Sequence, residues 1–263
     1  MDVPSFPDLR VTVDGPVATI TLDRPEVLNA LSLTLLGSLV DACAWLGSRP
    51  EIRVVVVTGA GRTFSAGADL STLDHLRGGD ETAARAAAGA GDRAATAIES
   101  LDAVTVAAIQ GRCVGGGVVL ALACDLRVAS ETARFSIPEI DLGIPLAWGG
   151  IPRLLREVPP AVARDLVLTC REFGAAEAQQ LGLVSRVHPP DHLDAAVTDL
   201  AVELAGKARL PVRATLDAVR TALGVGAPAG WSDADVLLSA VRDPESMAAG
   251  QRYLDRVFGA RGT

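Results

Sequence analysis

The chain has 263 residues, of which 49% are apolar and 21% are charged, a composition typical of a packed globular protein with one large domain or two modest ones. Its formal net charge of −8 argues against a general nucleic-acid-binding protein, and no long basic run is present to bind an anionic membrane. The four cysteines form no C-x-x-C pair, and neither a signal-peptide pattern nor a run of 18 apolar residues occurs. We therefore expect a reduced, cytoplasmic protein without a membrane span.

The N-terminal part of the chain predicts a hairpin, a helix and a buried strand. Residues 9–13 and 17–22 alternate in strand fashion around the turn-forming Asp14-Gly15-Pro16. Ser32 is typical of an N-cap, and the amphipathic pattern behind it predicts a helix through Trp45. Residues 52–58 are β-branched except for Arg53, which indicates a strand covered on both faces.

The middle of the chain repeats the order of strand, glycine-rich loop and helix. An Ala-rich segment, residues 83–101, predicts a helix, and residues 104–109 predict a second buried strand. That strand leads into Gly111 and then into Gly115-Gly116-Gly117, which open an apolar helix to Ala123. Short strands are predicted at 126–129 and 134–137.

The last third of the sequence is mostly helical. The predicted helices are 152–157, 160–168, 175–181, 191–207, 211–223 and 233–258, the last with a break at Pro244. Strand–helix units followed by helices favour an α/β sheet core with a helical region behind it, and we expect the boundary between Ser185 and Asp191.

Two loops after buried strands expose their backbone in small residues. The first is Phe64–Asp69 and the second is Gly111–Gly117. Small residues let a ligand approach the main chain, and a glycine run that opens a helix directs unpaired N–H groups at it. Two such loops facing each other would hold a developing oxyanion, each donor contributing about 3–4 kcal/mol. A single glycine run is more often simple close packing, and this one is neither a P-loop nor a dinucleotide fingerprint.

Taken together and in this order, the motifs of the chain resemble the enoyl-CoA hydratase/isomerase family, also called the crotonase family, over about residues 8–260. The segments that carry the resemblance are Arg24–Leu31, Val55–Gly59, Phe64–Leu70, Gly111–Gly117, Ala123–Arg127, Phe135–Glu139, Gly149-Gly150 with Arg153-Leu154, and Ala175–Ala178 with Gly182–Val184.

The resemblance implies a crotonase-like spiral of ββα units over residues 1–188, with the CoA and oxyanion site, and a C-terminal helical trimerisation region over 189–263. It implies an acyl-CoA thioester as substrate, no other cofactor, no metal, and a homotrimer or a dimer of trimers. By position, Ala68 and Gly116 carry the oxyanion-hole N–H groups, and Ala66 lies where the backbone meets the adenine. Glu139 occupies the position of a catalytic carboxylate.

The sequence departs from the family pattern at Val119, where two-carboxylate hydratases carry a second Glu. Valine can neither bind a water nor shuttle a proton, whereas a single Glu139 can move one proton between carbons, as in a 3,2-enoyl-CoA isomerase. An apolar Val119 would also raise the pKa of Glu139 by desolvation. Hydration with an atypical second group, hydrolysis or dehalogenation through Asp141, and a non-catalytic acyl-CoA-binding protein stay open as alternatives. In an extended segment Asp141 would face the same way as Glu139; as a turn residue it would only cap the chain before Gly143.

Three further residues are candidates for substrate contact. Asp69 is expected to cap the helix that follows it. Arg24 is either a cation for an anionic ligand or a solvated surface residue, and Trp148 either narrows the acyl pocket or simply packs. The three histidines lack the spacing of a metal site.

Overall fold

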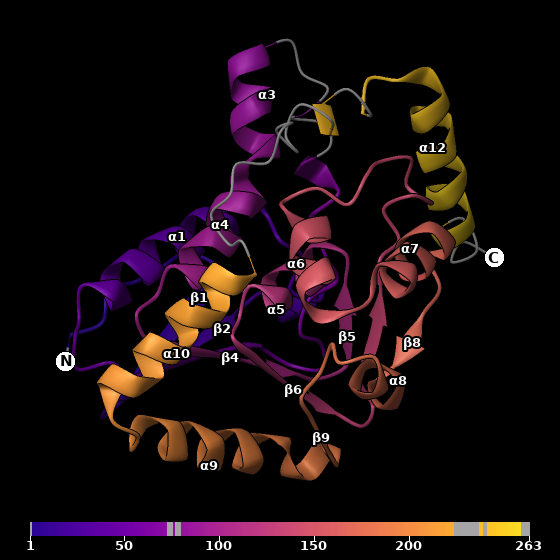
Figure 1. The fold of residues 1–263 in the computed structure, drawn as a ribbon. Coiled ribbons are helices and arrows are strands. Elements are labelled where there is room, and N and C mark those ends of the chain that lie inside the picture. The colour runs from indigo at the N-terminus through magenta and orange to yellow at the C-terminus, as the bar shows by residue number, and fades with distance from the viewer. Residues whose placement is uncertain (1, 73–75, 77–79, 224–236, 239–240, 259–263) are drawn as a thin grey trace.

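The structure, a computed structural model, describes residues 2–72, 76, 80–223, 237–238 and 241–258. A six-stranded main sheet runs through the molecule in the order β1-β2-β3-β4-β6-β9 (Figure 1). Its strands are Leu9–Asp14, Val17–Leu22, Val54–Gly59, Val104–Ile109, Leu126–Ser130 and Arg186–His188. Among the described strand pairs of this sheet only β1–β2 is antiparallel, so every later strand enters the sheet through a crossover.

The predicted hairpin, first helix and buried strands are all present. Ser32 caps helix α1, Leu33–Gly47, by accepting the Leu35 N–H at 3.1 Å. The inner strands are buried on both faces because helices cover both: Val55 and Val57 belong to one apolar cluster, whereas Val54 and Val56 belong to another.

The crossovers build a spiral in which each turn adds a main-sheet strand, a short strand in a second layer, and a helix. The second layer is a small sheet ordered β5-β7-β8, formed by Arg112–Val114, Arg134–Ser136 and Phe173–Gly174. Residue Ser65 extends this layer through a parallel bridge to Cys113. This is the expected crotonase-like arrangement of ββα units, and it places the loops after β3 and β4 next to each other.

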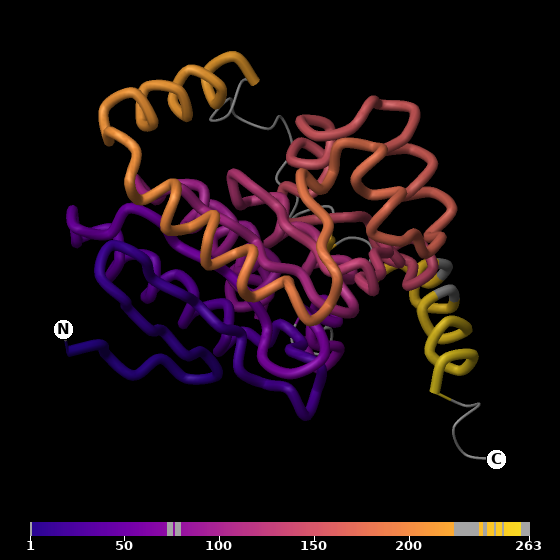
Figure 2. Tube along the Cα trace, turned by 90° about the horizontal axis from the view of Figure 1, so that it is seen from below, coloured from indigo at the N-terminus to yellow at the C-terminus, as the bar shows by residue number. Residues whose placement is uncertain are grey.

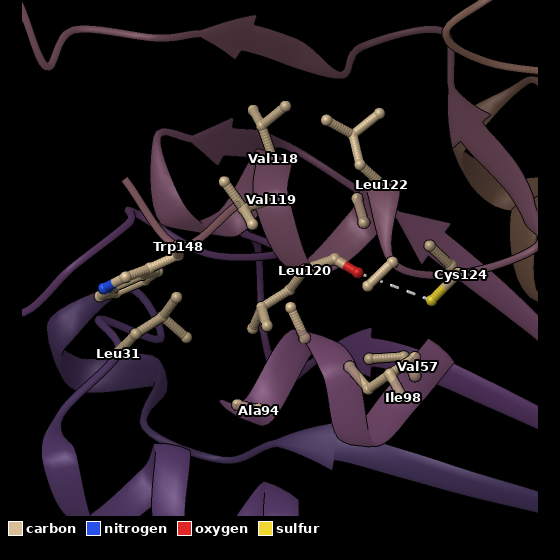
Figure 3. Packing of buried hydrophobic residues seen from close by; sticks show 14 of the residues in the cluster. Leu31, Val57, Ala94, Ile98, Val118, Val119, Leu120, Leu122, Cys124 and Trp148 are labelled. Carbon is tan, nitrogen blue, oxygen red and sulfur yellow. Dashed lines mark hydrogen bonds between the residues drawn. The ribbon is translucent and has the colours of Figure 1, made fainter. Parts of the chain in front are cut away.

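The helix predicted over 83–101 is instead two helices, α3, Glu81–Ala88, and α4, Ala90–Glu99. Gly89 ends the first and begins the second, because glycine has a poor helix propensity and adds no side-chain contact to hold the helix straight. Further helices in the described part of the chain are α5, Gly116–Leu122; α6, Gly150–Glu157; α7, Pro160–Thr169; and α8, Ala175–Gln180. A short 3-10 turn, Pro25–Val27, precedes α1. Figure 3 shows α5 among the buried apolar side chains, where Val118, Val119 and Leu120 are almost completely buried.

Three C-terminal helices lie within the described residues, each in a different place. Helix α9, Leu193–Ala205, covers the outer face of the main sheet, where Leu193, Val197 and Leu200 pack on the strands. Helix α10, Arg209–Ala222, and helix α12, Pro244–Phe258, lie on opposite sides of the molecule (Figure 2). The expected boundary at residues 188–189 falls directly after β9 and before the 3-10 turn Pro190–His192. Among the described residues, no helix combines the length and apolarity needed to cross a bilayer.

Candidate active site

A cavity of about 570 Å³ lies where the loop after β3, the N-terminus of α5, the turn around Glu139 and helix α12 meet. Its lining is mostly apolar. The lining residues that the site argument uses are Ala66, Gly67, Ala68, Asp69, Gly115, Gly116, Val119, Glu139, Trp148 and Tyr253.

The loop after β3 is held in place by a buried asparagine. Asn29 is fully buried, and its Nδ2 donates to the carbonyls of Ala60 and Thr63 at 2.9 and 2.7 Å. The main-chain carbonyl of Asn29 accepts a hydrogen bond from the Ser65 hydroxyl at 2.8 Å. Asn29 has a φ of +54°, a left-handed conformation that asparagine tolerates better than most residues. The loop that carries Ala66 and Ala68 is therefore fixed before any ligand binds.

The Ala68 amide faces away from its neighbouring segment. The Gly67 carbonyl accepts the Leu31 N–H at 2.8 Å, and in a planar trans peptide the N–H of the next residue points the opposite way. The Ala68 N–H is thus directed away from Leu31, and Ala68 is exposed to the cavity that it lines. No acceptor for this N–H is present among the residues that the structure describes.

The Gly116 amide is free for the same kind of reason. The Gly115 carbonyl accepts the Val119 N–H at 3.2 Å and so points along α5, which directs the Gly116 N–H out of the helix N-terminus. Within the described part of the chain this N–H also has no acceptor. Gly115 itself has a φ of +49°, which the turn into the helix requires.

The two loops are joined main chain to main chain. Ser65 N–H donates to the Arg112 carbonyl at 3.1 Å, and Val114 N–H donates to the Ser65 carbonyl at 3.0 Å. A Cβ placed on Gly67 would lie 3.7 Å from the Gly116 nitrogen. The peptide that carries the Ala68 N–H therefore lies directly beside the N-terminus of α5, and two free donors line one cavity.

Glu139 is a buried carboxyl group beside these donors. Its side chain is 8% exposed, and its Oε2 is a buried oxygen without a hydrogen-bond partner in the described residues. Its Oε1 lies 2.3 Å from the position that a Cβ on Gly115 would take, so only glycine fits next to the carboxyl. Burial raises the pKa of Glu139 to about 7, where both protonation states are populated at neutral pH.

Three other residues that line the cavity differ from Glu139 in charge, pairing or burial. Val119, at the position of a second Glu in two-carboxylate hydratases, is fully buried and apolar. Asp69 is paired with Arg24 at 2.9 Å and accepts the Ser71 N–H at 3.1 Å, which is the capping contact expected from the sequence. The Arg24 hydrogen bonds lower the pKa of Asp69 against the opposing effect of its burial, which is the largest single influence. Glu26 is exposed.

Arg24 is engaged by the protein itself. Its Nη1 donates to the Ala30 carbonyl at 2.6 Å as well as to Asp69, and its Nε lies 3.5 Å from Asp8. Its positive charge is thus shared between two carboxylates, which weakens the case for an anionic ligand.

Asp141 does not face the same way as Glu139. Residues 138–143 form a turn, in which Leu142 N–H donates to the Pro138 carbonyl at 3.1 Å, so the extended backbone that would align the two carboxyls is not present. The Asp141 carboxylate is exposed and lies 3.3 Å from Arg256 of α12, outside the cavity lining.

Trp148 and Ala66 both line the cavity. Ala66 is half-buried, and its N–H already donates to the Leu28 carbonyl at 2.9 Å. The indole of Trp148 is 8% exposed, and its nitrogen lies on the side of the ring away from Val119 and Leu120 (Figure 3).

Helix α12 brings residues to the cavity that the sequence did not single out. Tyr253, Val257 and Phe258 all line it, and burial raises the pKa of the Tyr253 phenol. The spacing of these three residues on one helix was the available signal, but it does not tell which surface the helix covers. In the described part of the chain, no group of three or more His, Cys, Asp or Glu side chains is arranged to hold a metal ion.

Comparison with known proteins adds independent evidence. The family model for enoyl-CoA hydratase/isomerase matches residues 12–254. A probable enoyl-CoA hydratase of Mycobacterium bovis is 37% identical over 84% of this chain and 86% of its own length. The peroxisomal Delta(3,5)-Delta(2,4)-dienoyl-CoA isomerase of Arabidopsis thaliana is 39% identical over 79% of this chain and 78% of its own length.

Solved structures support the same family assignment. An enoyl-CoA hydratase/isomerase from Mycobacterium paratuberculosis superimposes with a TM-score of 0.85 at 26% identity, over 96% of this chain and 100% of the other. A putative enoyl-CoA hydratase/isomerase family protein from Hyphomonas neptunium gives a TM-score of 0.78 at 33% identity, over 97% and 93% of the two chains. With the family model, the relatives and the fold in agreement, the chain belongs to the enoyl-CoA hydratase/isomerase family.

Proposed function

We propose that this protein isomerises an enoyl-CoA thioester by single-carboxylate proton transfer, with Glu139 as the base and acid and the Ala68 and Gly116 N–H groups as the oxyanion hole. The observation that carries the proposal is the unpartnered Oε2 of Glu139, buried in the cavity beside Gly115, the residue that precedes the free amide of Gly116. Because Val119 leaves no second carboxylate at the matching position, the chemistry is one that a single carboxyl completes.

In the proposed reaction the Glu139 carboxylate removes a proton from C2 of a 3-enoyl-CoA. The electron pair of the broken C–H bond forms the enolate, conjugated with the C3–C4 double bond, and the thioester oxygen takes the negative charge. That oxygen accepts from the Ala68 and Gly116 N–H groups, which are preorganised because the loops that carry them are already hydrogen-bonded. The Glu139 carboxylic acid then returns the proton to C4, and the double bond moves to C2–C3.

The pKa of Glu139 suits this role. A group that titrates at about 7 is a stronger base than an ordinary carboxylate and is still deprotonated in a large fraction of molecules at neutral pH. Burial supplies this shift, and the cavity that Glu139 lines also includes the apolar Val119.

The test is a direct assay with 3-enoyl-CoA and, separately, 2-enoyl-CoA. We expect the absorbance of the conjugated thioester to appear from the first substrate, and Glu139→Gln to lower kcat by about 10²–10⁴-fold. The dissociation constant should change little, because Gln keeps the shape of Glu. Unchanged turnover in Glu139→Gln would remove Glu139 from the mechanism, and tight binding without any turnover by the native protein would favour a non-catalytic binding protein.

A second candidate, hydration of 2-enoyl-CoA, is favoured by one observation. Tyr253 places a phenol in the lining of the same cavity as Glu139, and a hydroxyl can hold a water or pass a proton. If the protein is a hydratase of this kind, the conjugated absorbance is lost from 2-enoyl-CoA, and Tyr253→Phe abolishes that loss. The isomerase proposal instead predicts that Tyr253→Phe retains the conversion of 3-enoyl-CoA.

A further inference from the structure

Trp148 stands in a backbone conformation that bulky residues rarely adopt. Its φ is +58°, and the next residue, Gly149, also has a positive φ of +65°. A glycine or an asparagine at position 148 would fit this turn with less strain. The surrounding structure therefore holds Trp148 in a strained, left-handed backbone conformation.

Two glycines make the space that the indole fills. A Cβ on Gly91, in the first turn of α4, would lie 1.9 Å from an atom of the indole ring. A Cβ on Gly116, at the start of α5, would lie 2.2 Å from another. Even alanine would displace the ring from either side, so the ring touches the main chain of both helices.

A buried arginine fixes the turn that carries the indole. Arg153 is 5% exposed, and its Nη1 donates to the Trp148 carbonyl at 2.6 Å. The same guanidinium is paired with Asp92 at 3.0 Å and Glu99 at 2.7 Å, both on α4. The backbone of Trp148 is thus tied to the helix against which its ring lies, and the ring has little freedom to move aside.

The ring lies beside the place where the proposed function puts the thioester. It contacts Gly116, whose N–H is the proposed oxyanion donor, and it lines the cavity together with Ala87 of α3 and Leu146. We infer that the Trp148 indole is the end wall of the acyl pocket and restricts the protein to thioesters with short acyl chains. This inference rests on the proposed function for the position of the thioester oxygen, but not on which reaction follows. Behind the ring lies Gly91, so removal of the indole extends the pocket toward α4.

The test is a binding series that needs no turnover. Saturated, straight-chain acyl-CoAs of increasing length are titrated by calorimetry into the native protein and into Trp148→Gly and Trp148→Phe. Each methylene that is buried should lower the dissociation constant about four-fold. For the native protein we expect this fall to stop after a few carbons. It should continue over several more carbons in Trp148→Gly, so that the longest chains bind at least ten-fold more tightly than to the native protein.

Trp45→Phe is the matched control, because Trp45 lies on α1 against Phe6 and Arg49, outside the cavity lining, and its chain-length profile should be that of the native protein. If Trp148→Gly shows no cooperative melting, Trp148→Phe carries the test, with about four-fold tighter binding of the first chain that the native protein excludes. The same break point in all proteins, or no break point in the native one, overturns the inference and leaves the proposed function standing. Failure of the native protein to bind any acyl-CoA overturns both.

Discussion

At the scale of single residues, Glu139 couples the site to the stability of the fold. Its pKa is about 7 in the folded protein against 4.5 for an unperturbed carboxyl, because burial disfavours the charged form. Between these two values the folded state holds a proton that the unfolded state has lost, so the free energy of unfolding falls as the pH rises. The stability that the neutral carboxyl contributes is complete below pH 4.5 and is lost as the pH passes 7.

We therefore expect Glu139→Gln to stabilise the protein in a pH-dependent way. Gln cannot ionise, so its advantage over Glu should grow from acid to mildly alkaline pH by at most about 3 kcal/mol, the free-energy equivalent of the pKa shift. Urea denaturation of both proteins at pH 4.5, 7 and 9 measures this difference. A difference that stays constant over this range would mean that Glu139 titrates normally in the folded protein.

At the scale of secondary-structure elements, the sequence predicts what local chemistry determines. The β-branched run of β3 and the Ser32 cap of α1 are read directly from the residues. The break at Gly89 is not, because a glycine weakens a helix without fixing where it ends: Gly91, two residues later, lies inside α4. The turn that directs Asp141 outward is local, closed by the Leu142 N–H on the Pro138 carbonyl, and a turn before Gly143 was one of the two interpretations that the sequence left open.

The site, too, has features that the sequence predicts and features that it does not. Small residues after buried strands predict two loops with exposed main-chain N–H groups, and the family resemblance then identifies the amides of Ala68 and Gly116 within them. The position of α12 does not follow from the sequence motifs, because it depends on close contacts between main-chain segments that are far apart in the sequence. A Cβ on Gly143 would lie 1.9 Å from the Ser246 carbonyl oxygen, and one on Gly250 would lie 2.6 Å from the Leu142 carbonyl oxygen.

Because Gly250 lies against the Leu142 carbonyl, it is a position at which α12 contacts the turn that carries Glu139. Gly250→Leu would improve helix propensity but would place a side chain against the Leu142 carbonyl. We expect the helix to shift away from the cavity, with KM for an enoyl-CoA raised at least ten-fold and the melting temperature changed by only a few degrees. Ala248→Leu adds the same side chain on the exposed face of the same helix and should leave KM unchanged. Equal KM values for the two variants would contradict docking through Gly250.

At the scale of the whole molecule, the cavity lies between the spiral core and a peripheral helix, and a ligand that fills it must hold the two together. Gly67, Gly116 and Glu139 come from the core, whereas Tyr253 and Val257 come from α12. A ligand that binds only the folded state adds about 2.7 kcal/mol of stability at a concentration 100-fold above its dissociation constant. For a chain of this size that corresponds to a rise in melting temperature of roughly 5–10 °C.

We expect this rise with a short-chain acyl-CoA, and we expect most of it to be lost at the same ligand concentration in the double variant Tyr253→Ala/Val257→Ala. Both side chains line the cavity and are only half-buried without ligand, so the unliganded melting temperature should change little. The matched control is Gln251→Ala/Asp255→Ala, which removes a hydrogen-bonded pair from the exposed face of α12. It should keep the full ligand-induced shift in differential scanning calorimetry. Because the two double variants sit on one helix and differ only in the face they alter, equal shifts would mean that the ligand does not reach α12 and that the acyl-CoA site is confined to the core.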